Sequence, residues 1–181
     1  MERITSDLML SPLQPKDHGQ LFILMKQIYP PVYKHLWHDG GVAYVDSLYS
    51  KINFEKEVSD PLSKYYFIFY MGMPVGILRI LINERPPGIS SPDCIKLQRI
   101  YLAPSVQGKG IGKKLIQWAE KEFSHDKETT LWLETMSTQK AAVSFYEKTG
   151  FKIIGHFTFD SESMKGQYRE MVIMAKNIAK E

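Results

Sequence analysis

The chain has 181 residues, a formal net charge of +3 and a single cysteine. This length suits one domain over residues 1–181 with a real hydrophobic core. Cys94 alone excludes an intrachain disulfide, the first residues lack the apolar core of a signal peptide, and no apolar run is long enough to cross a membrane. The single cysteine fits a reducing cytosol, so we predict a cytoplasmic protein. The lack of a long apolar run and of a dominant basic block predicts that it has neither a membrane nor a nucleic-acid partner.

One strand and three helices are predicted for the first third of the chain. In order, they occupy residues 8–13, 15–29, 42–50 and 54–58. The first helix is expected to end at Pro30 and Pro31, because proline lacks the amide that a helix interior needs.

Strands dominate the rest of the chain. The predicted strands are residues 64–70, 75–82, 95–102, 130–134, 151–159 and 168–176. Helical spacing of apolar side chains predicts helices over residues 111–123 and 138–148, and Gly150 ends the second. Because strands outnumber helices and most sequence neighbours form hairpins, the predicted fold class is α/β (α+β), with a mixed, mostly antiparallel sheet and flanking helices.

A glycine-rich segment follows the strand at residues 95–102 and opens the next helix. Its residues are Gln107, Gly108, Lys109, Gly110, Ile111, Gly112 and Lys113. Glycines let backbone amides approach a ligand closely, and a helix start adds unpaired donors, so this segment is suited to bind phosphate. A Walker loop and a dinucleotide-binding loop each need a glycine at the position of Lys113, so neither template fits. An ordinary glycine-rich turn with close helix packing is the alternative.

Two strings in the sequence resemble signatures of one known superfamily. The pattern Gln-x-x-Gly-x-Gly at residues 107–112 resembles the acetyl-CoA loop of the GNAT superfamily of N-acetyltransferases. Residues 142–151, AVSFYEKTGF, are similar to a second GNAT signature, in the family order and at about the family separation. The resemblance spans residues 65–176. It implies the GNAT fold, with a seven-stranded sheet and splayed central strands, and acetyl-CoA as cosubstrate bound through its pyrophosphate at the glycine loop.

The resemblance also implies roles for individual residues. The strand residues expected to align the pantetheine arm and supply an oxyanion-binding N–H are Ile100, Tyr101 and Leu102. Tyr146 is expected to protonate the departing thiolate, since a phenol in hydrogen-bond reach can donate a proton. Phe145 and Lys148 are expected to contact the cofactor. A core tyrosine whose hydroxyl bonds the backbone is the alternative reading of Tyr146.

At the positions where many relatives carry the general base, this chain differs from the family pattern. Many relatives carry a glutamate on the central strand where this chain has Lys96 and Gln98, and neither is a carboxylate. Glu134, at the end of the next strand, is the nearest candidate and would act directly or through water. A solvated or lysine-paired carboxylate is the alternative. Gln139 stands where the family often has asparagine, and its amide is expected to bond the pantetheine, although its reach is longer.

Aromatic residues are dense in the region that lines the acceptor side in GNAT proteins. They are Tyr29, Tyr33, Trp37, Tyr44 and Tyr49. Such rings can hold an ammonium by cation–π contact, and core packing is the alternative. Asp39 and Asp46 either attract a cationic acceptor or cap and solvate helices. No metal site is predicted, because His35 and His38 have no third ligand at a known spacing.

The leading functional prediction is an acetyl-CoA-dependent N-acetyltransferase that acts on a primary amine. Within the superfamily the chain looks most like bacterial PaiA-type spermidine/spermine acetyltransferases, which implies a polyamine acceptor. Acetylation of protein N-terminal or lysine amines is the alternative in the same fold, and it would need an open groove. A CoA-binding regulatory module without catalysis is the alternative in another class. Homodimers are common among relatives, but the sequence specifies no interface.

Overall fold

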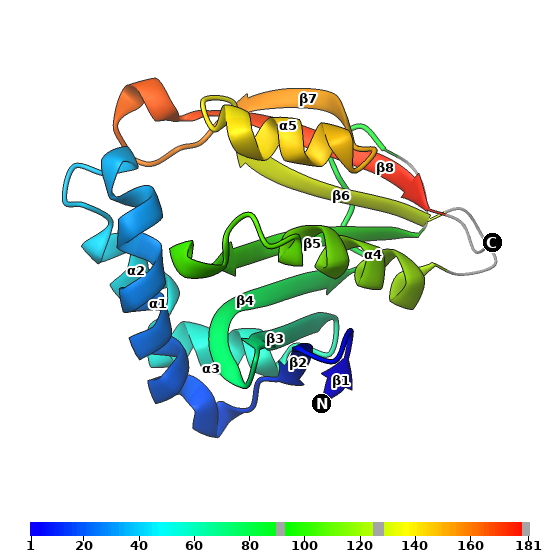
Figure 1. Cartoon of the computed structure of the whole chain (residues 1–181). Coiled ribbons are helices and arrows are strands. Elements are labelled where there is room, and N and C mark those ends of the chain that lie inside the picture. Colours follow the sequence, from blue (N-terminus) through cyan, green and yellow to red (C-terminus); the bar gives the residue numbers. More distant parts are fainter. Residues whose placement is uncertain (90–92, 125–128, 179–181) are drawn as a thin grey trace.

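A computed structural model describes residues 1–89, 93–124 and 129–178. Its strands form one eight-stranded sheet in the order β1-β2-β3-β4-β5-β6-β8-β7 (Figure 1). Their bounds are β1 Glu2–Arg3, β2 Leu8–Pro12, β3 Ser63–Tyr70, β4 Met73–Ile82, β5 Cys94–Leu102, β6 Thr129–Met136, β7 Lys152–Thr158 and β8 Glu170–Ile178. Every described pairing is antiparallel except that of β5 with β6. This confirms the predicted mixed, mostly antiparallel sheet of the α/β (α+β) class.

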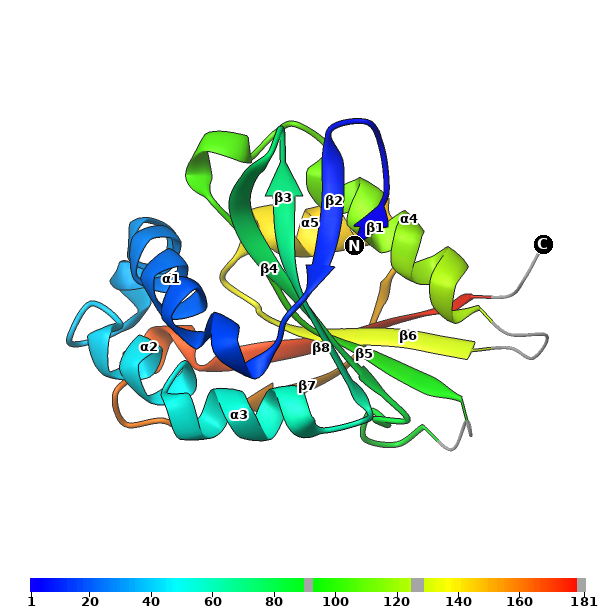
Figure 2. The ribbon, with the colours of Figure 1, turned by 90° about the horizontal axis from the view of Figure 1, so that it is seen from below.

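Helices cover both faces of the sheet. They are α1 His18–Tyr33, α2 Val42–Leu48, α3 Lys51–Ser59, α4 Ile111–Phe123 and α5 Lys140–Lys148. Figure 2 shows α4 and α5 on one side of the sheet and α1, α2 and α3 on the other. Each side has its own hydrophobic core: Leu115 of α4 and Leu133 of β6 lie in one, and Leu21 of α1 and Ile77 of β4 lie in the other.

Two sequence predictions about these elements were wrong. The sheet has eight strands instead of seven, because Glu2–Arg3 add a short edge strand that pairs with β2 and that two residues cannot signal by alternation. Helix α1 continues through Pro30 and Pro31 to Tyr33. Both prolines fall in its last turn, where few later bonds depend on them, and the amide of Lys34 still donates to the carbonyl of Pro30. The other predicted elements are present, with ends shifted by a few residues.

The two central strands separate along their length, as predicted. Strand β5 pairs with β6 only through Cys94–Thr130, Ile95–Leu131 and Lys96–Trp132, although β5 runs to Leu102 and β6 to Met136. On its other edge β5 carries a bulge, since Arg99 pairs with Arg79 and Leu97 with Ile80, which leaves Gln98 as the extra residue. The sheet therefore opens into a V past Lys96.

The longest described helix, α1, has 16 residues. Within the described ranges no helix combines the length and apolarity needed to cross a bilayer.

Candidate active site

The glycine segment adopts the geometry of a helix-opening loop. Gly108 and Gly110 have φ values of 78° and 73°, in the left-handed region that favours glycine, and a Cβ added at either would meet no atom within 4 Å. Helix α4 begins at Ile111, and its first hydrogen bond runs from the amide of Lys114 to the carbonyl of Gly110, 3.1 Å away. The amides of the preceding turn thus have no acceptor within the helix, and the space above the loop is open.

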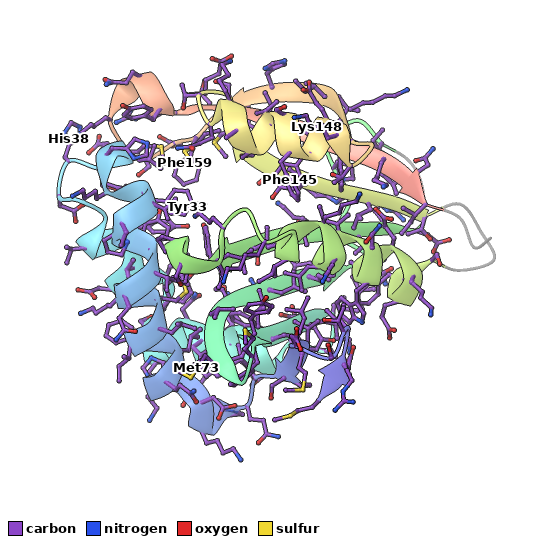
Figure 3. All side chains as sticks on the ribbon, viewed as in Figure 1. Tyr33, His38, Met73, Phe145, Lys148 and Phe159 are labelled. Atoms are coloured by element: carbon purple, nitrogen blue, oxygen red, sulfur yellow. The ribbon has the colours of Figure 1, made fainter. Side chains whose placement is uncertain are left out.

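Gly112 has a different role from the other two glycines. A Cβ built on it would lie 3.1 Å from Cζ of Phe145 on α5, which is closer than ordinary packing allows. The glycine therefore permits the close approach of α4 and α5. Phe145 projects from α5 into the space between the two helices (Figure 3).

A cavity of about 430 Å³ occupies the V between β5 and β6. Tyr146 and Ala142 of α5 line it from the side of the α4–α5 core, and Tyr29, Tyr33 and Trp37 line it from the side of the α1–α3 core. Because both groups line one cavity, it passes through the sheet where the strands separate. Two ligands that enter from opposite faces can meet there.

Strand β5 borders this cavity with its unpaired edge. Ile100 and Tyr101 line the cavity, and Leu102 follows them at the end of the strand. These three pair with β4 on one edge only, because the pairing with β6 stops at Lys96. The predicted pantetheine and oxyanion strand thus presents main-chain groups to the cavity.

Tyr146 lies at the α5 end of the cavity. Its side chain is buried, and its ring makes an edge contact with Phe151 at 5.7 Å between centroids. Burial raises the pKa of the Tyr146 phenol above its ordinary value of 10, and the nearby Tyr33 phenol adds to the rise. Tyr146 therefore stays protonated at neutral pH, the state that a proton donor requires.

Glu134 and Lys96 form an ion pair within the cavity wall. The Lys96 Nζ lies 3.1 Å from the Glu134 Oε2 and 4.3 Å from the centroid of the Trp132 ring. Both side chains are half-buried and line the cavity. The predicted base is thus close to the central strands, and it already has a lysine partner.

Of the other residues predicted to bind the cofactor, one lines the cavity and the rest are exposed on the surface. Gln139, just before α5, lines the cavity, and its side-chain nitrogen lies 3.2 Å from Nε2 of the exposed His35. Lys148 is exposed at the last turn of α5. Lys109 and Lys113 are likewise exposed, and the Lys109 ammonium lies over the ring of Tyr70.

Aromatic side chains form the α1–α2 side of the cavity. This aromatic wall consists of Tyr29, Tyr33, Trp37, Tyr44 and Tyr101. The rings pack on one another, with 4.5 Å between the centroids of Trp37 and Tyr44 and 4.8 Å between those of Tyr29 and Tyr33. The Trp37 Nε1–H donates to the Tyr29 hydroxyl at 3.0 Å. Figure 3 shows Tyr33 projecting from the end of α1 into the open space.

Two predicted acceptor-side features lie outside the cavity lining. Tyr49 is fully buried in the α1–α3 core. Asp39 accepts hydrogen bonds from the amides of Gly41 and Ala43, which lower the pKa of its carboxyl, and Asp46 pairs with Lys26 at 3.1 Å. The two aspartates therefore cap and solvate helices, the second of the two roles considered for them.

Sequence reasoning missed a second group of side chains that line the cavity and a cluster of buried charged residues next to it. The methionine wall consists of Met136, Met164 and Met171 with Phe157 and Phe159. Behind the strands, Glu57 of α3 binds both Arg79 and Arg99, and all three side chains are buried. These residues lie far apart in the sequence and belong to no motif, so only the folded chain brings them together.

Among the residues that the structure describes, no three histidine, cysteine, aspartate or glutamate side chains are arranged to hold a metal ion.

Comparison with known proteins identifies the family of this chain and several relatives. Residues 25–151 match the acetyltransferase (GNAT) family. An uncharacterized N-acetyltransferase of Lactobacillus delbrueckii subsp. lactis is 29% identical over 103 residues, which cover 57% of this chain and 60% of that protein. The chain thus spans less than two thirds of the length of the curated relatives it matches.

Solved structures show the same fold. The PaiA N-acetyltransferase of Thermoplasma acidophilum, in complex with coenzyme A, has a TM-score of 0.66 and 21% identity over 93% of this chain and 98% of that one. A mutant of the spermidine N-acetyltransferase SpeG of Vibrio cholerae has a TM-score of 0.64 and 20% identity over 96% of this chain and 95% of that one. With the family match over most of its length, the chain belongs to the acetyltransferase (GNAT) family.

Proposed function

We propose that this protein is an N-acetyltransferase that moves the acetyl group of acetyl-CoA to a small primary amine by direct attack in a ternary complex. The observation that carries the proposal is the single cavity that crosses the sheet between Tyr146 on one face and Tyr33 on the other. It allows a thioester from the α4–α5 side and an amine from the α1–α2 side to meet beside the unpaired edge of β5.

The glycine loop fits the diphosphate of the cosubstrate. The left-handed Gly108 and Gly110 leave open space over the loop, and the first-turn amides of α4 and the positive end of its dipole face that space. Lys109 and Lys113 add positive charge at its rim. Acetyl-CoA supplies an activated acetyl group, and the chain supplies its orientation.

The chain's own residues provide the remaining steps. A carbon–nitrogen bond forms as the carbon–sulfur bond breaks, and a main-chain N–H of β5 near Ile100 stabilises the negative charge on the carbonyl oxygen. Such an oriented donor contributes about 2.7–4 kcal/mol in other acyl-transfer enzymes. Tyr146 donates its proton to the departing thiolate. Glu134 takes the proton from the amine, directly or through water, and its ion pair with Lys96 holds the carboxylate in place at the cavity wall.

Three alternatives remain for the acceptor and the activity. A polyamine acceptor is favoured by the likeness to SpeG and by the rings of the aromatic wall, which can hold an ammonium. Protein N-terminal or lysine amines need an open groove, whereas Trp37 and Met164, which form a backbone bridge, bound the acceptor side of the cavity. A CoA-binding module without catalysis is favoured by the lysine partner of Glu134.

Calorimetry with CoA and acetyl-CoA, followed by an assay of thiol release across a panel of amines, tests the proposal. We expect cofactor binding and amine-dependent release of CoA. Absence of binding to well-folded protein would contradict the proposal, and binding without turnover of any amine would support the regulatory module.

Three broader predictions accompany this proposal. The cavity draws on helices and strands from both halves of the sequence, which supports one catalytic domain over residues 1–181. A cytoplasmic location and a homodimer remain predictions from the sequence and the resemblance, and fractionation and light scattering would test them.

A further inference from the structure

We propose that the acceptor is a compact apolar amine that also carries a carboxylate, as an apolar α-amino acid does, and is not a polyamine. This inference rests on the proposed acetyl transfer to an amine and names the class of its acceptor. It is carried by the rings and thioethers that line the cavity, by the backbone contact that bounds its acceptor side, and by the balance of buried charge around it.

The lining of the acceptor space is rich in aromatic rings and thioethers. The aromatic wall and the methionine wall line the same cavity, and they meet where Trp37 and Met164 form a bridge. Thioether side chains adapt to apolar groups and give little to a strongly hydrated chain with several charges. An acceptor with one apolar side chain therefore matches this space better than an extended polar one.

Backbone bonds join two distant segments at the acceptor side of the cavity. The amide of Lys165 donates to the carbonyl of Leu36 at 2.9 Å, and the amide of His38 donates to the carbonyl of Ser163 at 3.1 Å. Between them Trp37 and Met164 form a bridge and are both buried. Figure 1 shows the segment before β8 running past the end of α1. A cavity of about 430 Å³ that must also admit the thioester leaves room only for a small acceptor.

The charged side chains that line the cavity do not form an acidic site. They are Lys96, Arg99 and Glu134. Glu134 is the one carboxylate among the described lining residues, and Lys96 already neutralises it at 3.1 Å. A polyamine would bring several ammonium groups into a space that offers them no unpaired carboxylate, and buried charge without a partner is costly.

Among the residues that the structure describes, buried positive charge exceeds buried negative charge next to the acceptor space. Arg99 binds both carboxylate oxygens of Glu57 at 2.7 Å, and Arg79 binds one of the same oxygens at 2.9 Å. Arg79 also donates to two neutral groups, the Ser63 hydroxyl and the Gln98 amide oxygen. One buried carboxylate thus serves two buried guanidinium groups.

Two aromatic rings and the carboxylate of Asp60 reduce this excess of positive charge without removing it. The Arg99 guanidinium lies 5.6 Å from the centroid of the Tyr49 ring, and Arg79 lies 5.8 Å from that of Tyr65. Asp60 also acts on Arg79, but from a partly exposed position where solvent screens it. An acceptor carboxylate near Arg99 would complete the charge balance, while an additional cation would worsen it.

A matched panel of amines tests the inference. L-phenylalanine, phenethylamine, L-alanine and spermidine are compared by kcat/KM for CoA release at saturating acetyl-CoA. Phenylalanine and phenethylamine differ in the carboxylate, and phenylalanine and alanine differ in the apolar group. We expect phenylalanine to exceed each of the other three by at least about tenfold. A higher value for spermidine, phenethylamine or alanine would overturn the inference.

A pair of variants on β7 links the preference to the charge of the cavity. Phe157 lines the cavity and the neighbouring Thr158 is exposed, so Phe157→Glu adds a carboxylate to the wall and Thr158→Glu adds one to the surface. Phe157→Glu should lower the ratio of kcat/KM for phenylalanine to that for phenethylamine, whereas Thr158→Glu should leave the ratio unchanged. The ratio does not depend on how much of each variant folds. An unchanged ratio in Phe157→Glu would contradict the proposed role of charge.

The same experiments separate the two proposals. If calorimetry shows CoA binding but no amine in the panel is acetylated, the inference about the acceptor fails while the cofactor site stands. If CoA does not bind, the proposed function itself fails.

Discussion

The α4–α5 side of the cleft offers main-chain amides over a glycine loop, whereas the α1–α2 side offers stacked rings. On the first side the glycines at positions 108 and 110 have left-handed φ values and nothing above them. On the second, side chains from α1, α2 and β5 pack into the aromatic wall. Backbone recognition needs particular residues at fixed spacing and so produces a motif. Side-chain recognition needs only a suitable surface, which many sequences can build.

The largest effect is expected from Tyr146→Phe, which tests the chemistry between the two sides. Loss of the hydroxyl removes the proposed proton donor, so kcat should fall about 10²- to 10⁴-fold while the Kd for CoA stays unchanged. Thiol release and calorimetry measure the two quantities. Tyr66→Phe is the control, because Tyr66 is a buried tyrosine on β3 that packs against Trp118 outside the cavity. Undiminished turnover in Tyr146→Phe would remove this residue from the mechanism.

Glu134 and Lys96 provide the next test, since their ion pair has either a chemical or a structural role. If Glu134 is the base, Glu134→Gln should lower kcat about 10²-fold or more, and adding Lys96→Gln should not restore it. If the pair only stabilises the wall, the double variant should recover the rate because no buried charge is left unpaired. A double-mutant cycle on kcat and on the melting temperature distinguishes these outcomes.

A smaller effect, on cofactor binding instead of the chemical step, is expected from Gly108→Ala. Gly108 and Gly72 have φ values of 78° and 77°, and an added Cβ meets nothing within 4 Å at either, so both alanine variants carry the same backbone strain. Only Gly108 lies in the proposed cofactor loop. We expect Gly108→Ala to weaken CoA binding roughly tenfold, about 1.4 kcal/mol, while Gly72→Ala loses stability alone. Equal CoA affinity in the two variants would show that the loop does not bind the diphosphate.

The smallest effect concerns pH, because the tyrosines on both sides stay protonated. Burial raises the pKa of Tyr146 above its usual value of 10 and that of Tyr33 to about 12. A group whose pKa is raised on folding contributes stability that is present below pH 10 and is lost as pH rises towards 12. Activity should therefore rise with pH as the acceptor amine loses its proton, without a falling limb below pH 10. A falling limb at lower pH, with the protein still folded by circular dichroism, would contradict the buried phenol as the acid.

The sequence by itself determined the fold class, the family and the glycine loop. Alternation of apolar residues marks strands because one face of each strand is buried, and the glycines before α4 are needed for a backbone conformation that other residues rarely adopt. The two-residue β1 and the part of α1 beyond Pro30 were not predicted, because neither has a local sequence pattern long enough to identify it.

Only the tertiary structure decided which side chains share the cavity. It paired Glu134 with Lys96, brought Glu57 of α3 to Arg79 and Arg99, and set Met164 against Trp37 across more than half the chain. The cavity opens where β5 and β6 stop pairing at Lys96, and segments far apart in the sequence line it. Packing and charge balance act through space, so residues without any local periodicity or spacing can determine what such a cavity accepts.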